Sequence, residues 1–279
     1  MVVEHPFSIN NPSGDAIRGD LRYSDDPGAK PLVLICHGFT AHKDWGSFPY
    51  FGRKLAGDGF ATIVFNFSHN GIGPNSTAFT EYEKFSRNTP GKELEDVQAL
   101  LDAISNGKIG RGVVDASRIG MAGHSRGGGI SILSAARDSR VRSIVAWSTV
   151  ATFLRFTEHQ REEWERTGYL PLRYGSARTL LRYDVSVLRD LEVNKDQYDL
   201  HKGALRLSVP ALYVHGGADV IVRPEEAEGL YKSTTGARSQ FALIEGAGHM
   251  YGAMHPFRET NPMIEQLLEL TANWFHQTL

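Results

Sequence analysis

One short motif combines residues that can perform covalent chemistry. Gly123-His124-Ser125-Arg126-Gly127 places a serine between two glycines, after an apolar run and before a segment of helical period. A sharp strand-to-helix turn needs glycine two residues before and after its centre, and its strained backbone pushes the central side chain out above the sheet. The motif predicts that Ser125 is an exposed nucleophile. The alternative is an ordinary serine in a glycine-rich turn.

A serine hydroxyl is a weak nucleophile at neutral pH and needs two further groups. An imidazole takes its proton, and a carboxylate holds that imidazole in the correct tautomer. His249 in GAGHMY and Asp219 in HGGADVIV each follow a late apolar run. Each has a plainer interpretation, as a surface histidine in a turn or a turn-forming aspartate. The order Ser125, Asp219, His249 along the chain nevertheless predicts a catalytic triad.

Two backbone N–H groups are expected to bind the negative oxygen of a tetrahedral intermediate. One is normally that of the residue after the nucleophile, here Arg126. The other is expected from Phe39, because Gly38 before it lets the chain turn its amides inward. We expect His37 to be structural. The side chain of Arg126 has three open interpretations: a substrate contact, an anchor for an acidic substrate group, or an internal ion-pair partner.

Metal chemistry is not expected from the remaining histidines. His69 and His215 also follow apolar runs, but no cluster with metal-ligand spacing accompanies them. Cys36 is the only cysteine, so the chain can form neither an internal disulfide nor a cysteine-rich zinc or iron–sulfur site. We therefore predict no metal.

The elements that must position these residues are predicted to form an α/β fold. Short apolar runs alternate with segments of helical period, which is typical of a mostly parallel sheet with helices on both faces. Strands are expected at 31–37, 61–67, 118–123, 141–148, 210–216 and 240–246, after an edge hairpin over 6–23. Helices are expected at 47–56, 93–104, 127–136, 224–231 and 262–275. Residues 68–90 are predicted to form one long surface loop.

An insertion is predicted between two of these strands. About 60 residues separate Ser148 from Pro210, far more than a parallel crossover needs. The excess carries amphipathic pieces such as HQREEWERTGYL and ARTLLRYDVSVLRDLE, which favour a small helical cap. The predicted organisation is a core domain of residues 1–152 and 206–279 and a cap of residues 153–205.

Composition and charge exclude several classes of partner. The 279 residues include 30 basic and 32 acidic ones, a formal net charge of -2, so no large electrostatic attraction to nucleic acid or an anionic membrane is expected. MVVEHPFSIN has neither the basic region nor the apolar stretch of a signal peptide. No segment approaches the roughly 18 apolar residues of a membrane span. We expect a cytoplasmic protein whose partner is a small molecule.

The motifs together resemble the α/β-hydrolase superfamily: HGF at 37–39, GHSRGG at 123–128, HGGAD at 215–219 and GAGH at 246–249. The resemblance covers nearly the whole chain from residue 30. It looks closest to the feruloyl or cinnamoyl esterases and the serine aminopeptidase-like hydrolases, partly because HGFTAHKDW is similar to their oxyanion loop. It implies a cap over the site, no cofactor, and the triad and oxyanion roles given above. Ser125 disfavours the chemistries of members with an Asp or Cys nucleophile.

Hydrolysis of a small to medium acyl or aryl ester through an acyl-enzyme is the favoured activity, including feruloyl or cinnamoyl esters. The residues expected to line an acyl or aryl pocket are Phe39, Trp147, Phe153, Tyr169 and Met250.

Two alternatives remain open from the sequence. An aminopeptidase or thioesterase would use the same triad, and a peptidase would bind the substrate ammonium with cap carboxylates, for which the candidates are Glu158, Glu162, Glu163 and Glu165. A non-catalytic ligand-binding module belongs to a different class, because fold alone does not fix function. Every catalytic position is filled here, which argues against the module.

Overall fold

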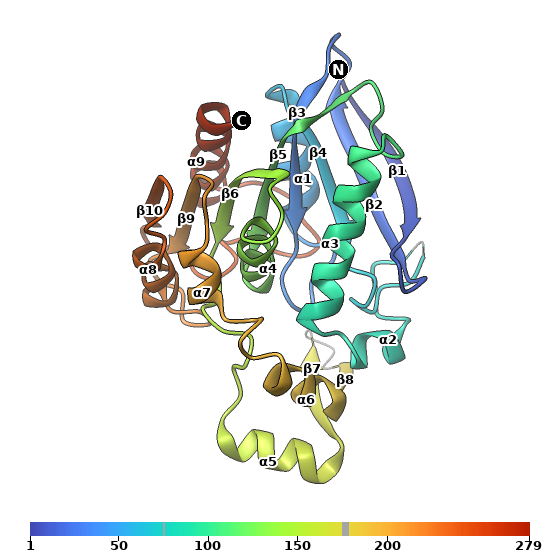
Figure 1. Cartoon of the computed structure of the whole chain (residues 1–279), viewed down its shortest axis with the longest axis vertical. Coiled ribbons are helices and arrows are strands. Elements are labelled where there is room, and N and C mark those ends of the chain that lie inside the picture. The colour runs from blue at the N-terminus through green and yellow to red at the C-terminus, as the bar shows by residue number, and fades with distance from the viewer. Residues whose placement is uncertain (75, 175–178) are drawn as a thin grey trace.

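The fold is built around one large twisted sheet. The computed structural model describes residues 1–74, 76–174 and 179–279. In this part of the chain eight strands pair in the order β1-β2-β4-β3-β5-β6-β9-β10 (Figure 1). β2 pairs antiparallel with β1 and β4, and the remaining neighbours are parallel. The strands are β1 (Val2–Asn10), β2 (Ala16–Ser24), β3 (Lys30–Cys36), β4 (Ala61–Asn66), β5 (Val114–His124), β6 (Val141–Trp147), β9 (Ala211–Gly216) and β10 (Ser239–Ile244).

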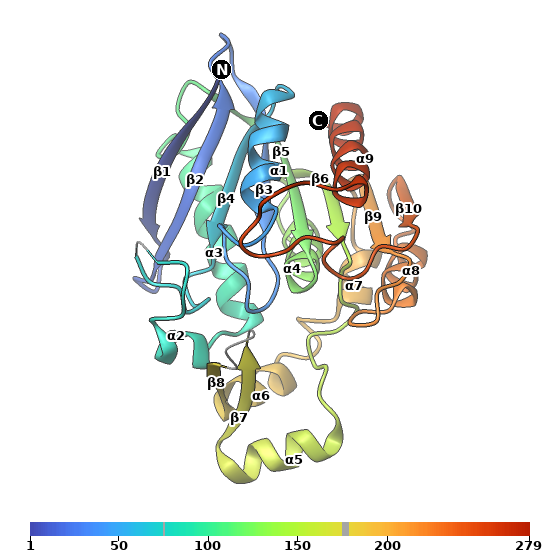
Figure 2. The same ribbon diagram turned by 180° about the vertical axis from the view of Figure 1, so that it is seen from behind.

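Helices cover both faces of this sheet. α1 (Phe48–Gly57) and α9 (Pro262–Thr278) lie on one face, and α3 (Pro90–Ser105), α4 (Arg126–Ala135) and α8 (Pro224–Ser233) on the other, as Figure 1 and Figure 2 show from opposite sides. Local signals set several helix starts. Thr89 caps α3 and Asn261 caps α9, and each stands before a proline, whose missing N–H costs nothing at the first helical position. The predicted α/β class is confirmed.

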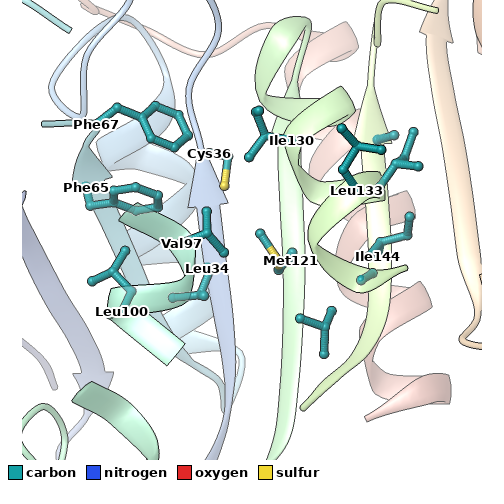
Figure 3. Packing of buried hydrophobic residues seen from close by; sticks show 14 of the residues in the cluster. Leu34, Cys36, Phe65, Phe67, Val97, Leu100, Met121, Ile130, Leu133 and Ile144 are labelled. Atoms are coloured by element: carbon teal, nitrogen blue, oxygen red, sulfur yellow. The ribbon is translucent and has the colours of Figure 1, made fainter. Parts of the chain in front are cut away.

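Strand alternation divides the hydrophobic core into two parts. Leu34 and Cys36 of β3 pack on the side of α3 and α4, where Figure 3 shows them with their neighbours. Val33 and Ile35 point to the opposite side and pack with residues of α1 and α9. Because both faces are covered, a central strand is an unbroken apolar run, which is why its position could be predicted from sequence.

The insertion contains a β-hairpin that the prediction of a helical cap did not include. β7 (Tyr169–Tyr174) and β8 (Thr179–Asp184) pair antiparallel between α5 (Glu158–Thr167) and α6 (Val185–Val193). Leu181 and Tyr183 are buried whereas Leu180 and Arg182 are exposed. This alternation with a period of two is typical of a strand, and the prediction of a helix for this stretch did not take it into account. These elements lie beyond one end of the sheet (Figure 1, Figure 2), and α7 (Leu200–Leu205) packs against α4 and α8.

The stretch 68–90 is not the simple surface loop that was predicted. Ser68 is buried, and its N–H donates to the carboxylate of Asp96 in α3 at 2.7 Å. A short helix, α2 (Tyr82–Ser86), carries the buried Phe85, which packs edge-on against Phe79. Single aromatic anchors in a polar stretch produce no periodic pattern, so this packing could not be predicted from the sequence.

Candidate active site

Ser125 occupies a strained turn between β5 and α4. Its φ of 55° and ψ of -118° are unfavourable for a residue with a side chain, and such strain concentrates at functional sites. The two motif glycines are required sterically. A Cβ on Gly123 would lie 2.2 Å from the carbonyl oxygen of Gly127, and a Cβ on Gly127 would lie 2.3 Å from that of Cys36. The geometry is that of a nucleophile elbow.

Asp219 and His249 are brought together by the loops after β9 and β10. The Nδ1 of His249 lies 2.8 Å from Oδ2 of Asp219, whose side chain is fully buried. The other carboxylate oxygen accepts the backbone N–H groups of Ile221 and Val222 at 2.9 and 3.0 Å. Burial alone would raise the pKa of Asp219, but the hydrogen bond from His249 and those from the backbone outweigh it and hold this pKa below its ordinary value. Asp219 is therefore ionised at neutral pH.

Three residues that the sequence did not single out position the loop of His249. The Tyr251 hydroxyl donates to the carbonyl of Val214 in β9 at 2.9 Å and accepts from the Ser148 hydroxyl at 2.9 Å. Nε2 of His124 lies 2.9 Å from the carbonyl oxygen of His249. Burial lowers the pKa of His124 to about 3, so the ring is neutral and, since a carbonyl only accepts, donates from Nε2. For His124 and Tyr251 the available signal was their proximity in sequence to Ser125 and His249, whereas Ser148 lies far from both along the chain.

The predicted oxyanion donors lie beside Ser125. A Cβ on Gly38 would lie 3.2 Å from Cβ of Ser125, so the loop after β3 passes directly against the elbow. Phe39 and Arg126 line the same pocket as Ser125. Among the described residues, neither of their backbone N–H groups donates an intramolecular hydrogen bond. Both N–H groups are therefore available to a ligand.

The pocket above Ser125 has a volume of about 420 Å³, within the usual range for small-molecule sites. Ser125 and His249 both line it. Its remaining wall is largely apolar, and the core and the insertion together supply six aromatic side chains to it: Phe39, Trp45, Phe153, Phe156, Tyr174 and Tyr183. The pocket therefore suits an apolar or aromatic group next to a reacting carbonyl.

The structure separates the predicted pocket residues into two groups. Phe153 and Met250 line the pocket with Phe39, whereas Trp147 and Tyr169 do not. Trp147 lies on the face of the sheet that α1 and α9 cover, where it packs on Phe51 and donates its Nε1–H to Thr271 of α9 at 3.0 Å. Tyr169 starts β7, is 36% exposed and lies under the guanidinium of Arg182. The prediction was wrong for Trp147 and Tyr169.

The side chain of Arg126 forms the internal ion pair that was one of its three interpretations. Its Nε donates to Glu93 of α3 at 2.8 Å, and its Nη1 donates to the hydroxyl of Tyr183 at 2.9 Å. Glu93 and Tyr183 come from segments far apart in sequence, so no local pattern could have indicated them. The network ties the elbow to both α3 and the insertion.

The cap glutamates considered for a substrate ammonium lie elsewhere. Glu163 pairs with Arg166 at 2.6 Å and Glu165 with Arg189 at 3.0 Å on the surface of the insertion. None of the four candidates lines the pocket. The structure thus offers these carboxylates no contact with a substrate bound at Ser125.

The two histidines considered as metal ligands have other neighbours. His215 lies 2.9 Å from the carbonyl oxygen of Val222, and His69 lies 3.8 Å from a carboxylate oxygen of Asp15. In residues 1–74, 76–174 and 179–279, no group of three or more His, Cys, Asp or Glu side chains is arranged to hold a metal ion. Within the same residues, no helix has the length and apolar character needed to cross a membrane.

Known proteins share both the sequence pattern and the fold. Residues 32–262 match the model of the alpha/beta hydrolase family. An Escherichia coli protein described as an uncharacterized 31.7 kDa protein in the traX-finO intergenic region is 25% identical over 280 residues, covering 89% of this chain and 91% of its own. Bis(hydroxyethyl) terephthalate hydrolase of Streptomyces coelicolor is 31% identical over 132 residues, 44% of this chain and 37% of that protein.

A solved structure extends the likeness over the whole fold. Est1E from Butyrivibrio proteoclasticus with bound ferulic acid superimposes with a TM-score of 0.70 at 20% identity, covering 98% of each chain. The strand order, the elbow and the match over residues 32–262 lead to one assignment. The chain belongs to the alpha/beta hydrolase family.

Proposed function

We propose that this protein hydrolyses carboxylic esters through an acyl-enzyme formed on Ser125. His249 takes the proton of the Ser125 hydroxyl, and the alkoxide attacks the ester carbonyl. The backbone N–H groups of Phe39 and Arg126 stabilise the oxyanion, which is worth about 3 to 4 kcal/mol per donor in comparable sites. His249 then protonates the departing alcohol. Water activated by the same histidine releases the acid and regenerates Ser125.

The observation that carries this proposal is the 2.8 Å contact between His249 Nδ1 and buried Asp219 at a pocket that also exposes Ser125. Because Nδ1 of His249 is hydrogen-bonded to the Asp219 carboxylate, Nε2 is the ring nitrogen that can accept the proton of the Ser125 hydroxyl. Asp219 is held ionised, so it stabilises the imidazolium that forms when the proton moves. A merely structural histidine would need none of these features.

An aromatic or apolar ester is the proposed substrate class. The aromatic wall of the pocket supports it, because such side chains pack on flat or apolar groups and provide few polar contacts. Two relatives point the same way: one is named for its action on bis(hydroxyethyl) terephthalate, and the other binds ferulic acid. A feruloyl or cinnamoyl ester is accordingly the first natural candidate.

The test is hydrolysis of p-nitrophenyl esters from acetate to long acyl chains, together with methyl ferulate and an aminoacyl anilide. We expect the esters to be cleaved by the wild type and not by Ser125→Ala, with the optimal chain length reporting the depth of the pocket. Cleavage of the anilide alone would replace the esterase by a peptidase. Cleavage that Ser125→Ala retains would remove Ser125 from the mechanism.

A further inference from the structure

One buried histidine beside the triad has no role in the proposed reaction. His215 is the fifth residue of β9, its side chain is fully buried, and it does not line the substrate pocket. Complete burial is uncommon for histidine, and a buried polar side chain needs hydrogen-bond partners. The partners of His215 therefore indicate why a histidine stands at this position.

The ring of His215 contacts the turn that carries the acid of the triad. Its Nε2 lies 2.9 Å from the carbonyl oxygen of Val222 and 3.3 Å from Oδ2 of Asp219. A carbonyl oxygen only accepts, so Nε2 carries the proton and donates it to Val222. The same N–H lies close enough to Asp219 to stabilise the negative charge of the carboxylate. His215 thus contacts the turn at two points.

The ring of His215 is neutral. Burial lowers the pKa of His215, and the neighbouring Asp219 carboxylate does not offset this effect. Nδ1 is buried and has no hydrogen-bond partner among the described residues, so a second proton there would be unpaired. The ring therefore acts as a single, fixed donor. Of the two histidines that contact Asp219, His249 is the one that lines the pocket with Ser125.

Val222 is held at both ends by Asp219 and His215. Its N–H donates to Oδ1 of Asp219 at 3.0 Å, and its carbonyl oxygen accepts from His215. Oδ1 also accepts the N–H of Ile221, whereas Oδ2 lies 2.8 Å from His249 and 3.3 Å from His215. Each carboxylate oxygen has two contacts, so the carboxylate cannot turn without losing some of them. Removing the His215 ring would free both the Val222 carbonyl and one side of Oδ2.

From these contacts we infer that His215 is a positioning residue, which holds the Asp219 carboxylate in the orientation that hydrogen-bonds His249, through Val222 and through its own contact with Oδ2. The inference rests on the proposed ester hydrolysis and adds a residue that acts through the acid of the triad. The alternative is a histidine that only fills the core. The two differ in one consequence: an effect on turnover that passes through Asp219 must vanish when the Asp219 carboxylate is absent.

The experiment compares His215→Gln with His215→Met. Both replacements are unbranched and of similar length, but glutamine keeps an amide N–H donor close to the position of Nε2, whereas methionine has no donor. Each change is made in the wild type and in Asp219→Ala. The kcat and KM for a p-nitrophenyl ester are measured at a temperature at which circular dichroism shows every variant folded, so that loss of folded protein is not counted as loss of turnover.

With Asp219 present, we expect the kcat of His215→Met to lie about tenfold to a hundredfold below that of His215→Gln, because a misdirected carboxylate orients His249 poorly. KM should differ by less than about twofold, since His215 does not line the pocket. In Asp219→Ala the two variants should have the same kcat within about twofold. Equal kcat values with Asp219 present, or an equal loss in both backgrounds, would overturn the inference.

His69 provides the matched control. It is also a buried histidine beside a carboxylate, with Nε2 3.8 Å from Oδ2 of Asp15, and it does not line the pocket. His69→Gln and His69→Met should therefore have equal kcat values. A fall in His69→Met as large as that in His215→Met would show that losing the donor slows turnover at any buried histidine, and would contradict a specific role of His215.

A measurement on the wild type keeps the inference testable if His215→Met does not fold. Nitrogen NMR chemical shifts distinguish protonated from unprotonated ring nitrogens, and the His215 signals are identified by their absence from His215→Gln. We expect a proton on Nε2 and none on Nδ1 at neutral pH, whereas a proton on Nδ1 alone would exclude donation to the turn and refute the inference. This measurement needs no turnover, so its result is separate from ester hydrolysis, which fails if the wild type cleaves no ester.

Discussion

The floor of the pocket and its outer wall are built in different ways. The floor, formed by Ser125 and His249, is held by short polar contacts inside the core, such as the N–H of Ser125 to the carbonyl of Trp147 at 2.8 Å. The outer wall, residues 153–174 and 179–193, lies mostly beyond the end of the sheet and carries ion pairs on its surface (Figure 1). The floor can therefore hold the catalytic residues in one geometry, whereas the sequence of the wall can vary and so determine which substrate binds.

The largest effect that separates the two regions should come from Ser125→Ala. We expect kcat for a p-nitrophenyl ester to fall by on the order of a millionfold, because no other group can form the acyl-enzyme. The circular dichroism spectrum should not change. A variant that keeps a substantial part of the wild-type rate would show that the floor does not perform the reaction.

Asp219→Ala is expected to have the next largest effect. Losing the carboxylate frees Nδ1 of His249 and removes the partner of the imidazolium, so kcat should fall about ten-thousandfold. The matched change in the wall is Asp184→Ala, which removes only the cap of α6 and should leave kcat within a few fold. Similar losses in both variants would contradict the division between floor and wall.

The pH dependence of stability is a third difference. Burial lowers the pKa of His37, a core residue next to Gly38 of the pocket, from 6.5 to about 3, so this ring stays neutral where an unfolded chain takes up a proton. The unfolded state then binds more protons between pH 6.5 and 3, and the free energy of unfolding should fall as the pH drops, by up to about 1.4 kcal/mol per pH unit.

Urea unfolding of His37→Gln between pH 6.5 and 4 checks this slope. We expect the variant to lose stability less steeply with acidification than the wild type. His159→Gln, at an exposed position of the wall, should keep the wild-type slope. Equal slopes in wild type and His37→Gln would mean that His37 is not kept neutral by the fold.

How much of the molecule could be predicted follows the same division. The strands, Ser125, Asp219 and His249 are encoded locally, since a buried strand is an apolar run and an elbow needs its glycines. The wall depends on packing between distant segments. Trp147 was misplaced because strand alternation, which decides its face, was not applied, and Glu93 was not recognised because its partner Arg126 is 33 residues away.

Tyr251→Phe should produce a smaller change in the core, at the loop that carries His249. The variant loses the hydroxyl that links Val214 and Ser148, which should lower the free energy of unfolding by about 1 to 2 kcal/mol. Tyr169→Phe is the control, because that ring is partly exposed on the wall. Chemical denaturation of both variants tests the difference, and equal stabilities would show that the hydroxyl network contributes nothing.

The smallest effect is expected for an ion pair of the wall. Arg189→Gln removes the partner of Glu165 at the surface, where solvent and salt screen the interaction. The thermal midpoint and the kcat for esters should both stay within measurement error. A clear loss of activity would mean that this pair fixes the wall over the pocket, so that the outer wall is as constrained as the floor.

Covalent labelling tests the central claim most directly. The folded wild type is treated with a fluorophosphonate, digested, and the modified residue is located by mass spectrometry, with Ser125→Ala treated in parallel. Activation of a serine by His249 and Asp219 predicts stoichiometric modification at Ser125 and none in the variant. An unlabelled wild type, or a label on any residue other than Ser125, would contradict the assignment of Ser125 as the nucleophile of this site.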